Sequence, residues 1–577
     1  MHKRLIHRIE KSISPELENS DLHPVLKRIY SHRDIHHLQQ VEYSLSRLLP
    51  VDQLKGMDQA MNILLPAVKQ NKKILIVGDF DADGATSTAV CYRALNMMGA
   101  SRVSYLVPNR FDFGYGLTPE LVAVAAKNSP DVLITVDNGI SSIEGVAAAK
   151  ALGIQVLVTD HHLPGDTIPI ADAIVNPNQL GCGFPSKNLA GVGVIFYVML
   201  ALRQALRNDG WFDEKRIEPN MGRLLDLVAL GTVADVVPLD ENNRILVEQG
   251  LKRIRSGQCC VGIQAMLDVA GRDSHNIVAS DLGFAVGPRL NAAGRLEDMS
   301  LGIECLLTDD MNTARMIAGQ LDDLNRNRRV IEQDMQQQAM ENLQSALASL
   351  DAEHLPKGIC LYHPEWHQGV IGILASRIKE KFNRPVIAFA DSGNGEIKGS
   401  ARSIKGLHIR DALDAVNTRH PGLIIKFGGH AMAAGLTMRQ ENFLQFEQAF
   451  DQEASRQLDD AALQGIIESD GALPSDDMTI QLAECLRQSG PWGQHFPEPV
   501  FDGEFIVDNW RIVGENHLKM QLQAVDANQL MDAIAFNINP EQIEWTNGRI
   551  HAAYRLDVNH YMNRKSAQLI VEYFEPI

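Results

Sequence analysis

Three aspartates at alternate positions follow a short apolar run early in the chain. The run is Ile74–Val77, and the aspartates are Asp79, Asp81 and Asp83, with Gly84 directly after them. An apolar run of this length predicts a buried strand, and the small residues after the aspartates predict the start of a helix. Carboxylates crowded into one loop repel one another unless a cation or solvent neutralises them. The loop therefore predicts a metal site, and the number of carboxylates favours two ions.

Further polar side chains follow two more predicted strands of the same region. They are Asp137, after Val132–Val136, and Asp160, His161 and His162, after Val156–Thr159. The strands alternate with predicted helices, which indicates a parallel sheet, and ligands bind beyond the carboxyl ends of such strands. A single aspartate after a strand is often only a helix cap, and a pair of histidines is often a surface feature. Several strand ends that all carry such groups are better explained by a metal site.

Asp235 lies at the end of an apolar helical run, shortly before Pro238. A buried carboxylate without a partner is costly, so Asp235 either caps a neighbouring group or binds a cation, and we favour the cation. Oxygen and imidazole ligands without thiolates suit Mn²⁺ or Mg²⁺, and two such ions can clamp the attacking and leaving oxygens of a phosphoryl displacement. The chain lacks a Walker A loop, so ATP is not indicated. Gly191-Val-Gly193 lacks the third glycine of a dinucleotide fingerprint and favours tight helix packing.

The chain is too long for one hydrophobic core, because 577 residues predict three or more domains. We predict an α/β protein with a parallel-sheet catalytic domain, a long connector helix, a smaller α/β domain and a C-terminal all-β domain resembling an OB barrel. The predicted parts are an N-terminal helical segment (1–70), the catalytic domain (71–300), the connector (301–355), the second α/β domain (356–455) and the all-β domain (456–577). The connector carries an apolar stripe at helical spacing, formed by Ile317, Leu321, Leu324, Ile331 and Met335.

Local signals mark several element ends. Thr118, directly before a proline, predicts the start of a helix, and Ser141 or Ser142 predicts the next, which Gly153 ends. The acidic and polar stretch 451–480 predicts a linker.

Composition limits the classes of function. A net charge of −18 argues against a broadly basic nucleic-acid surface, although a groove lined locally by arginines is compatible with it. No apolar stretch is long enough to span a membrane, and the basic N-terminus is not followed by the apolar region of a secretory signal. The seven cysteines form no C-x-x-C pair, which favours a reducing cytoplasm and argues against a zinc–thiolate site.

Several side chains could hold a phosphate backbone, because arginine presents a planar fork of donors to phosphate oxygens. Arg110 follows the second predicted strand, near the catalytic edge. Arg289, Asn291 and Arg295 lie in a segment rich in glycine and alanine, where the backbone can approach a strand closely. An ion pair within the protein is the alternative role for each arginine.

The second α/β domain offers further donors. Ser400 and Arg402 follow a strand-like run and supply hydroxyl, backbone and guanidinium groups. The glycines before His430 allow backbone N–H groups to face a phosphate, with a helix cap as the alternative role for His430. Candidates for stacking against bases are Tyr115, Tyr362 and Trp366, and each could equally lie in a core.

Taken in order, these motifs resemble those of the DHH phosphoesterase superfamily, and within it the 5′→3′ exonucleases specific for single-stranded DNA. The matching segments are Gly78–Gly84, Val136–Gly139, Asp160–His162, Gly231–Asp235, Gly287–Arg295, Trp366–Gly369 and Gly428–His430. The resemblance extends from about residue 40 to residue 577. It implies a DHH catalytic domain, a DHHA1-like substrate-binding domain and an OB-like nucleic-acid-binding domain.

The resemblance also implies roles for individual residues. The implied metal ligands are Asp81, Asp83, Asp137, His161 and Asp235, with Asp137 bridging the two ions. Asp79 and Asp160 would orient these ligands, and His162 would contact the scissile phosphate. Ser400 and Arg402 would hold the 5′-terminal phosphate.

One position departs from the superfamily pattern. Many relatives carry a histidine where this chain has Val77. Either Val77 only completes the strand, or one Mn²⁺ or Mg²⁺ ion binds weakly here and arrives with the substrate.

The implied function is a two-metal exonuclease that releases 5′-mononucleotides from single-stranded DNA in recombination and repair. The expected partners are a single-stranded-DNA-binding protein and a helicase, and we expect a cytoplasmic monomer. The alternatives are a DHH phosphodiesterase or pyrophosphatase for small substrates, and a DNA-binding scaffold without activity. The long connector and the β domain argue against the first alternative, and the intact aspartates and histidines argue against the second. The cleavage polarity comes from the resemblance alone.

Overall fold

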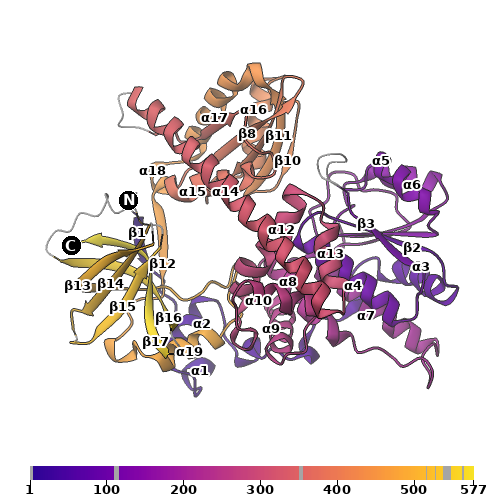
Figure 1. The fold of residues 1–577 in the computed structure, drawn as a ribbon, viewed down its shortest axis with the longest axis horizontal. Helices are drawn as coiled ribbons and strands as arrows, with labels where there is room; N and C mark the ends of the chain where they lie inside the picture. The colour runs from indigo at the N-terminus through magenta and orange to yellow at the C-terminus, as the bar shows by residue number, and fades with distance from the viewer. Residues whose placement is uncertain are drawn as a thin grey trace.

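The chain forms a parallel-sheet unit, a second α/β unit and a closed barrel, and a long helix joins the first two (Figure 1). The structure is a computed structural model that describes residues 4–108, 116–349, 355–514, 516–526, 528–536, 538, 548–561 and 564–577. No helix within these ranges has the length and apolar character that a bilayer span needs. The predicted order of architectures, from parallel sheet to all-β domain, is confirmed.

The first sheet has five parallel strands in the order β3-β2-β4-β5-β6. They are β2 (Ile74–Gly78), β3 (Val103–Leu106), β4 (Val132–Val136), β5 (Gln155–Thr159) and β6 (Ala173–Val175). Gly78 lies opposite Val136, and Val136 lies opposite Thr159, so three neighbouring strands end level with one another. The residues that follow these strands therefore meet at one edge of the sheet.

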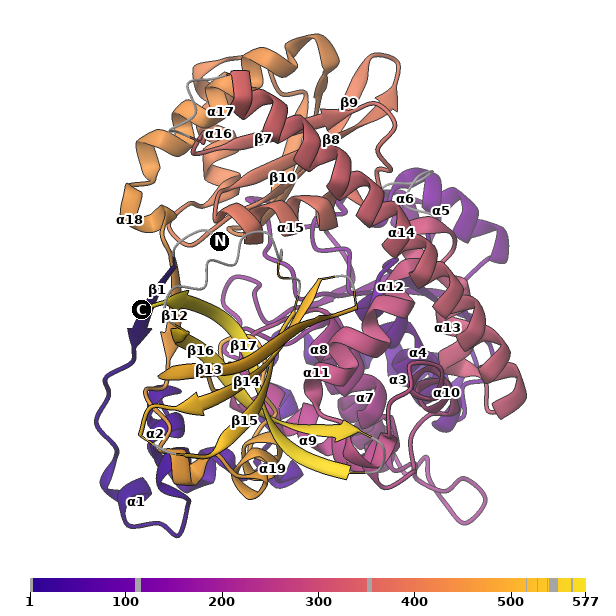
Figure 2. The same ribbon diagram turned by 60° about the vertical axis from the view of Figure 1, so that its left-hand side comes forward.

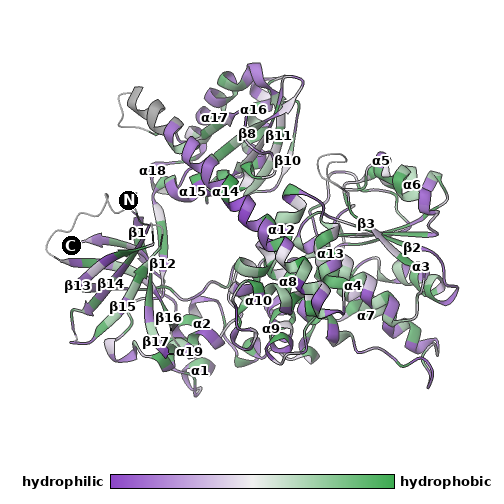
Figure 3. Cartoon of the chain, in the orientation of Figure 1, coloured by the Kyte–Doolittle hydropathy of each residue, from purple (hydrophilic) through white to green (hydrophobic). Residues whose placement is uncertain are grey.

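Helices cover both faces of this sheet, which explains why its strands are apolar throughout. They are α3 (Met57–Lys69), α4 (Ala82–Met97), α5 (Pro119–Ala125), α6 (Ile143–Ala151), α7 (Gly191–Asn208) and α8 (Leu225–Ala234). Ile74 and Ile76 of β2 pack into the core with α3, α4 and α7, whereas Leu75 and Val77 pack into the core with α5 and α6. Figure 3 shows hydrophobic residues along these strands and on the helices beside them.

Further helices follow α8 in the chain and belong to the same unit. They are α9 (Glu241–Arg255), α10 (Val261–Val269), α11 (Ala279–Asp281), a π-helical turn (Leu282–Val286), α12 (Gly287–Leu296) and α13 (Ser300–Leu307). Helix α12 packs against α4, which begins at the sheet edge, and against α8, which ends there.

Two of the predicted helix caps have different outcomes. The Thr118 hydroxyl accepts a hydrogen bond from Leu121 N at 3.3 Å, which confirms it as a cap. Ser142 stands directly before α6, but its hydroxyl accepts from Leu117 N at 3.0 Å and makes no capping bond. The helix therefore starts where the sequence predicts, with Ser142 at its N-cap, but this serine makes no capping bond because the turn before α5 takes its hydroxyl. Gly153, with φ 77°, follows the end of α6 as predicted.

The connector is one helix, α14 (Met311–Ser349), of 39 residues. At about 1.5 Å per residue it is roughly 58 Å long. Its predicted apolar stripe is divided between two cores. Ile317 and Leu321 pack into the core of the first unit, whereas Met335 packs into the core of the second. The helix thereby fixes the two units relative to each other.

The second unit is a mixed sheet in the order β10-β11-β9-β8-β7, in which only β7 and β8 are parallel. The strands are β7 (Ile359–His363), β8 (Val386–Gly393), β9 (Glu396–Arg402), β10 (Lys426–Gly429) and β11 (Ala433–Arg439). The helices are α15 (Ile371–Phe382), α16 (Ile409–Arg419) and α17 (Phe443–Gln457).

The C-terminal part is a closed barrel in the order β13-β14-β15-β17-β16, which confirms the predicted all-β domain. Its strands are β13 (Phe501–Val513), β14 (His517–Ala524), β15 (Leu530–Ala535), β16 (Arg549–Tyr561) and β17 (Arg564–Pro576). Helix α19 (Ile480–Gln488) packs against β16 and β17.

The N-terminal segment contains a strand as well as the predicted helices. Its elements are β1 (Arg4–Arg8), α1 (Pro15–Glu18) and α2 (Pro24–His32). Strand β1 pairs in parallel with β12 (Gly465–Ser469), beside the barrel (Figure 2). The stretch 451–480, predicted as a linker, carries β12, the end of α17 and the short helix α18 (Asp460–Leu463). The linker prediction is wrong there, because a distant segment of the chain supplies a partner strand.

A buried ion pair attaches the N-terminal segment to the barrel side of the molecule. Asp470 accepts hydrogen bonds from His32 Nδ1 at 2.8 Å and from Arg33 Nη2 at 2.9 Å. The Arg33 and Asp470 side chains are only 4% and 2% exposed. Removing one partner of such a pair leaves an uncompensated buried charge.

We predict that Asp470→Asn lowers the free energy of unfolding by roughly 3–5 kcal/mol, because Arg33 loses its counter-ion in a buried site. Urea unfolding followed by tryptophan fluorescence measures this, since the ring centroid of Trp492, one of five tryptophans, lies 6.3 Å from that of Tyr30 in α2. The matched control is Asp477→Asn. Asp477 lies 3.7 Å from His23, both side chains are about one-third exposed, and the expected loss is below about 1 kcal/mol. Equal losses of unfolding free energy in the two variants would contradict a stabilising role for the buried ion pair of Arg33 and Asp470.

Candidate metal-dependent active site

Asp79, Asp137 and Asp160 directly follow the three strand ends that lie level in the sheet. The structure therefore brings together the strand-end groups that the sequence predicts. All three side chains are buried. Their proximity follows from the parallel register and not from their spacing in the chain.

The loop after β2 is held tightly by hydrogen bonds to its own backbone and to α12. Asp81 caps α4 and accepts from Asp83 N and Gly84 N, both at 3.0 Å. Asn291 of α12 accepts from Ala82 N at 2.8 Å. A side chain at Gly84 would lie 2.4 Å from the carbonyl oxygen of Asp79, so the turn requires glycine there.

Asp83 is held by the first turn of α7. Its Oδ2 accepts from Gly191 N at 2.6 Å, and its Oδ1 accepts from Val192 N at 2.9 Å. The N–H groups of a first helical turn have no partners within the helix, so a carboxylate is well placed there. A Cβ atom at Gly191 would lie 2.6 Å from both Cβ and Oδ1 of Asp137. The close packing predicted for Gly191-Val-Gly193 is therefore confirmed at Gly191. Its contact with the two aspartates is a feature that sequence reasoning missed.

Asp137 adopts a backbone conformation that is rare for residues other than glycine. Its φ is 62°, and its N–H donates to Thr159 O at 3.0 Å. Asn138 holds the same turn by donating to Val77 O at 3.1 Å and to Val136 O at 2.9 Å. A left-handed residue in this position carries strain that surrounding contacts must maintain, and such residues cluster at functional sites.

Asp160 orients the histidine pair. Its Oδ1 accepts from His161 N at 2.7 Å, from His162 N at 3.1 Å and from His162 Nδ1 at 2.7 Å, while Oδ2 accepts from Ile140 N at 2.9 Å. Both oxygens are therefore engaged with the protein. These hydrogen bonds allow Asp160 to hold His161 and His162 in position.

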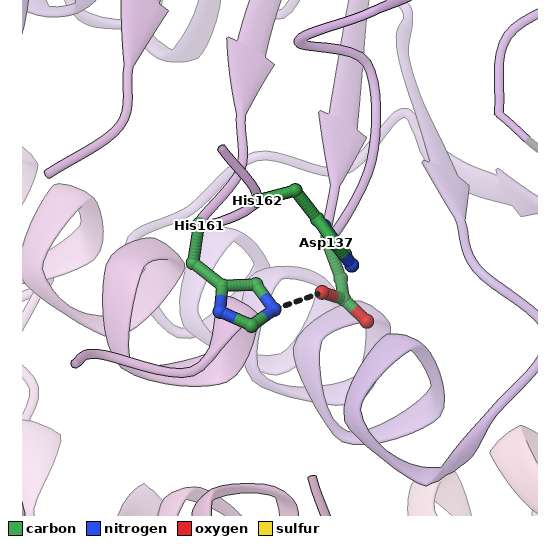
Figure 4. Close-up of side chains that lie close together, drawn as sticks. All are labelled: Asp137, His161 and His162. Carbon is green, nitrogen blue, oxygen red and sulfur yellow. Dashed lines mark ion pairs between the residues drawn. The ribbon is translucent and has the colours of Figure 1, made fainter. Parts of the chain in front are cut away.

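The His161 ring points at three carboxylates. Its Nε2 lies 3.2 Å from Asp137 Oδ1, 3.4 Å from Asp235 Oδ2 and 4.0 Å from Asp83 Oδ2. Figure 4 shows His161 facing Asp137, with His162 beside them. Among the residues that the structure describes, His161 Nε2 is buried and makes no hydrogen bond.

The residues of the cluster fit a hard divalent cation. Three overlapping groups bring one ligand atom from each residue within 4.8 Å: Asp137, His161 and His162; Asp83, His161 and Asp235; and Asp79, Asp81 and Asp137. Carboxylate oxygens and imidazole nitrogens are donors that Mn²⁺ and Mg²⁺ take. A buried imidazole nitrogen that faces carboxylates without a hydrogen bond is explained by an ion between them.

The pKa values of the cluster reflect the crowding of buried carboxylates. Burial, followed by repulsion from neighbouring carboxylates, raises the pKa of Asp83 to about 7 and that of Asp235 to about 8, and raises the pKa of Asp137 as well. Burial and the adjacent His162 lower the pKa of His161, which favours the neutral imidazole that binds metals.

His162 has the opposite electrostatic character and contacts the second unit. Burial alone would lower its pKa, but the hydrogen bond with Asp160 and the nearby carboxylates raise it to about 9. Its ring stacks on the ring of His430, with centroids 6.0 Å apart and an angle of 23° between the planes. The structure thus places His430, a predicted site residue, against His162 of the candidate metal cluster.

The α12 residues predicted to bind substrate occupy different settings. Asn291 supports the aspartate loop, as described above. Arg289 donates to Ala285 O at 2.6 Å and forms an ion pair with Asp322 of α14 at 2.7 Å. Arg295 donates to Gly369 O of the second unit at 3.0 Å. The ion pair within the protein, the alternative role for arginine, is therefore realised at Arg289, and a role of these residues in substrate binding remains a prediction.

In the second unit, Ser400 and Arg402 lie together beside the start of α15. Arg402 Nη1 donates to Ser400 Oγ at 3.1 Å, and a side chain at Gly372 would lie 2.9 Å from both groups. The guanidinium of Arg402, the hydroxyl of Ser400 and the glycine at position 372, in the first turn of α15, form a cradle that suits a phosphate.

The remaining predicted residues lie in different settings. Arg110 and Tyr115 lie outside the described residues. Trp366 is 3% exposed and donates to Gln338 Oε1 at 2.8 Å, so it is a core residue and not a stacking platform. Tyr362 packs against Phe443, with ring centroids 5.7 Å apart. Val77 is fully buried in the core with α5 and α6, so its side chain completes the strand. Its effect on metal affinity stays a prediction.

We predict that Gly191→Ala lowers the affinity for Mn²⁺ by about tenfold or more, because the added methyl group would displace the Asp137 carboxylate. Calorimetric titration with Mn²⁺ measures the affinity, and circular dichroism checks the fold. The matched control is Gly183→Ala, since an added Cβ there meets nothing within 4 Å. Equal Mn²⁺ affinity in the two variants would contradict the prediction.

Comparison with known proteins agrees with this geometry. The DHH family N-terminal domain matches residues 73–232, the DHHA1 domain matches residues 355–456, and the RecJ OB domain matches residues 469–573. The single-stranded-DNA-specific exonuclease RecJ of Salmonella typhimurium is 54% identical over 579 aligned positions, which cover 100% of this chain and 100% of that protein.

Solved structures give the same result. The crystal structure of RecJ from Thermus thermophilus in complex with Mn²⁺ matches with a TM-score of 0.81 and 29% identity, covering 99% of this chain and 80% of that chain. The same protein in complex with Mg²⁺ matches with a TM-score of 0.76 and 27% identity, covering 99% of this chain and 78% of that chain. The chain therefore belongs to the RecJ family of single-stranded-DNA-specific exonucleases.

Proposed function

We propose that this chain removes 5′-mononucleotides from the 5′ end of single-stranded DNA by metal-dependent hydrolysis of the phosphodiester bond. The observation that carries the proposal is the convergence of Asp83, Asp137, His161 and Asp235 at the sheet edge. Membership of the RecJ family supplies the substrate class.

The carboxylate cluster would hold two ions of Mn²⁺ or Mg²⁺. The proposed ligands are Asp81, Asp83, Asp137, His161 and Asp235. When bound, such ions lower the pKa of water and neutralise charge on the phosphodiester. A carboxylate oxygen of Asp79 lies within 4.8 Å of one from Asp81 and one from Asp137, and Asp160 holds the two histidines in position.

His162 would supply positive charge to the scissile phosphate. Its hydrogen bond through Nδ1 to Asp160 keeps the ring oriented and favours its protonated form. The imidazolium would donate from Nε2 to a phosphate oxygen, where negative charge develops during hydrolysis. The stacked ring of His430 supports this orientation from the second unit.

The second unit would set the polarity of cleavage along the DNA strand. Ser400 and Arg402 would hold the 5′-terminal phosphate, while the scissile bond lies at the carboxylate cluster. The rigid α14 fixes the separation of the two sites, so only a strand with a 5′ end within reach is cut at its terminal bond. The barrel would bind the strand beyond the carboxylate cluster, as OB folds do.

The wider setting is part of the same proposal. We infer that the enzyme acts as a monomer in the cytoplasm during recombination and repair, alongside a single-stranded-DNA-binding protein and a helicase. The seven cysteines are free thiols, which suits a reducing compartment.

We predict that Asp137→Ala lowers the exonuclease rate by more than about a hundredfold while strand binding persists, because it removes the ligand proposed to bridge the two ions. The assay incubates long single strands, labelled at either end, with Mn²⁺ and follows the release of nucleotides. Fluorescence anisotropy measures strand binding. The matched control is Asp323→Ala, whose side chain is 74% exposed on α14.

The 5′ label should be released first, as a mononucleotide. Cleavage that survives Asp137→Ala would overturn the proposed bridging role. Release from the 3′ label first would overturn the polarity, and activity on pyrophosphate or dinucleotides alone would favour the small-substrate alternative.

A further inference from the structure

A polar cavity lies on the catalytic unit, away from the carboxylate cluster. Its volume is about 970 Å³, and its walls include three arginines, Arg93, Arg223 and Arg253. We propose that this cavity, the arginine pocket, binds a nucleotide through its phosphate group. The proposal concerns a site separate from the metal cluster and does not depend on the nuclease reaction.

The arginine pocket and the metal cluster lie at opposite ends of the same two helices. Asp81 and Asp83 stand at the start of α4, whereas Arg93 lies in its last turns. Asp235 follows the end of α8, whereas Asp226 lies in its first turn and lines the pocket. At about 1.5 Å per residue, the pocket lies roughly 13–18 Å from the cluster along these helices. Figure 1 shows α4 beside α8, and the two helices are packed together.

Two of the three arginines have donors that the protein does not use. The Arg253 side chain is 20% exposed, and its Nε is buried without a hydrogen-bond partner in the described part of the chain. The nearest carboxylate, Asp226 Oδ1, is 3.9 Å from Nε, which is beyond hydrogen-bond distance. Arg223 is exposed and makes no side-chain hydrogen bond or ion pair with any residue that the structure describes.

The third arginine is held in place. Arg93 donates from Nε to Leu306 O at 3.1 Å and from Nη2 to Asp309 Oδ1 at 3.0 Å. It therefore presents a fixed positive charge at the rim of the pocket. A preorganised guanidinium loses less conformational entropy when it binds an anion.

The two aspartates of the pocket offset only part of this positive charge. Asp226 Oδ2 accepts from Cys260 N at 2.6 Å and its Oδ1 accepts from Leu227 N at 3.0 Å, so both oxygens are directed at the backbone. Asp309 is paired with Arg93 and its side chain is 87% exposed. Three arginines against two aspartates leave an excess of positive charge, although the whole chain carries −18. A planar guanidinium fork matches the oxygens of a phosphate.

The other walls of the pocket suit a base and a sugar more than a bare phosphate. Tyr92 supplies apolar surface, and Gln258 supplies an amide group that can pair with the edge of a base. Asn96 donates from Nδ2 to Tyr92 O at 2.8 Å and offers its amide oxygen. Sites for small molecules commonly have volumes of about 300–1,000 Å³, so the pocket has room for a nucleotide. The combination of cationic, apolar and amide walls is what selects this class of ligand.

The test is calorimetric titration of the full-length protein, in EDTA, with a deoxynucleoside monophosphate and, separately, with inorganic phosphate. EDTA removes divalent ions, so binding is measured without nuclease turnover. We expect saturable binding of the nucleotide, at least about tenfold weaker binding of phosphate alone, and at least about tenfold weaker nucleotide binding in Arg223→Ala and in Arg253→Gln. Arg223 is exposed, so its substitution should leave the fold intact.

Two control variants locate the binding. Arg456→Ala removes an arginine that is 54% exposed in the second unit, and Asp137→Ala alters the metal cluster, so neither should change nucleotide affinity. Absence of saturable binding, or affinity unchanged by Arg223→Ala, would overturn the proposal. Loss of binding in Asp137→Ala would place the nucleotide in the active site, and equal affinity for phosphate alone would overturn the nucleotide assignment.

Discussion

Electrostatic repulsion among buried carboxylates is the constraint on which the rest of this structure depends. Asp79, Asp83 and Asp137 are buried at one sheet edge, with Asp235 close to them. The backbone N–H groups of α7, the turn at Asp137 and the hydrogen bonds of Asp160 all hold acidic groups where water cannot screen them. Such a cluster is stable only with protons or with cations, and its oxygen-rich composition selects divalent metal ions.

The proposed function also requires a fixed distance between the site of cleavage and the site that would hold the 5′ end of the strand. Helix α14 is packed into the cores of both α/β units, so it links the unit with the carboxylate cluster to the unit with the Ser400–Arg402 cradle. Arg295 and the stacked pair His162 and His430 add contacts across the same junction. Most of α14 is hydrophilic along its length, which fits a helix that is buried on one stripe only (Figure 3).

Much of the site could be predicted because it follows from strand ends. In a parallel sheet, residues after neighbouring strands meet at one edge, so Asp79, Asp137 and Asp160 are recognisable without knowledge of the tertiary structure. The helix that holds Asp83 could not be predicted in the same way. Gly191 lies 108 positions further along the chain, and its N–H points at Asp83 only because α7 packs against α4.

Other features depend equally on tertiary context. Strand β1 pairs with β12 although Arg4 and Gly465 are far apart in the chain. The local sequence pattern therefore indicated neither strand, and the stretch that contains β12 was predicted to be a linker. Trp366 was a candidate for stacking because aromatic type alone does not distinguish a core residue from a platform. Ser142 stands where a helix cap belongs, but a neighbouring turn takes its hydroxyl.

The most direct test of the central claim is the proton balance of metal binding. The pKa of Asp83 is raised to about 7 and that of Asp235 to about 8, so these carboxyls are partly protonated near neutral pH and must release protons when a cation binds. Calorimetric titration with Mn²⁺ in buffers of different ionisation enthalpy counts these protons. We expect release of about one to two protons near pH 7, and affinity that rises from about pH 6 to about pH 8.5 as protons cease to compete. Binding without proton release, with the same affinity across this range, would contradict the account.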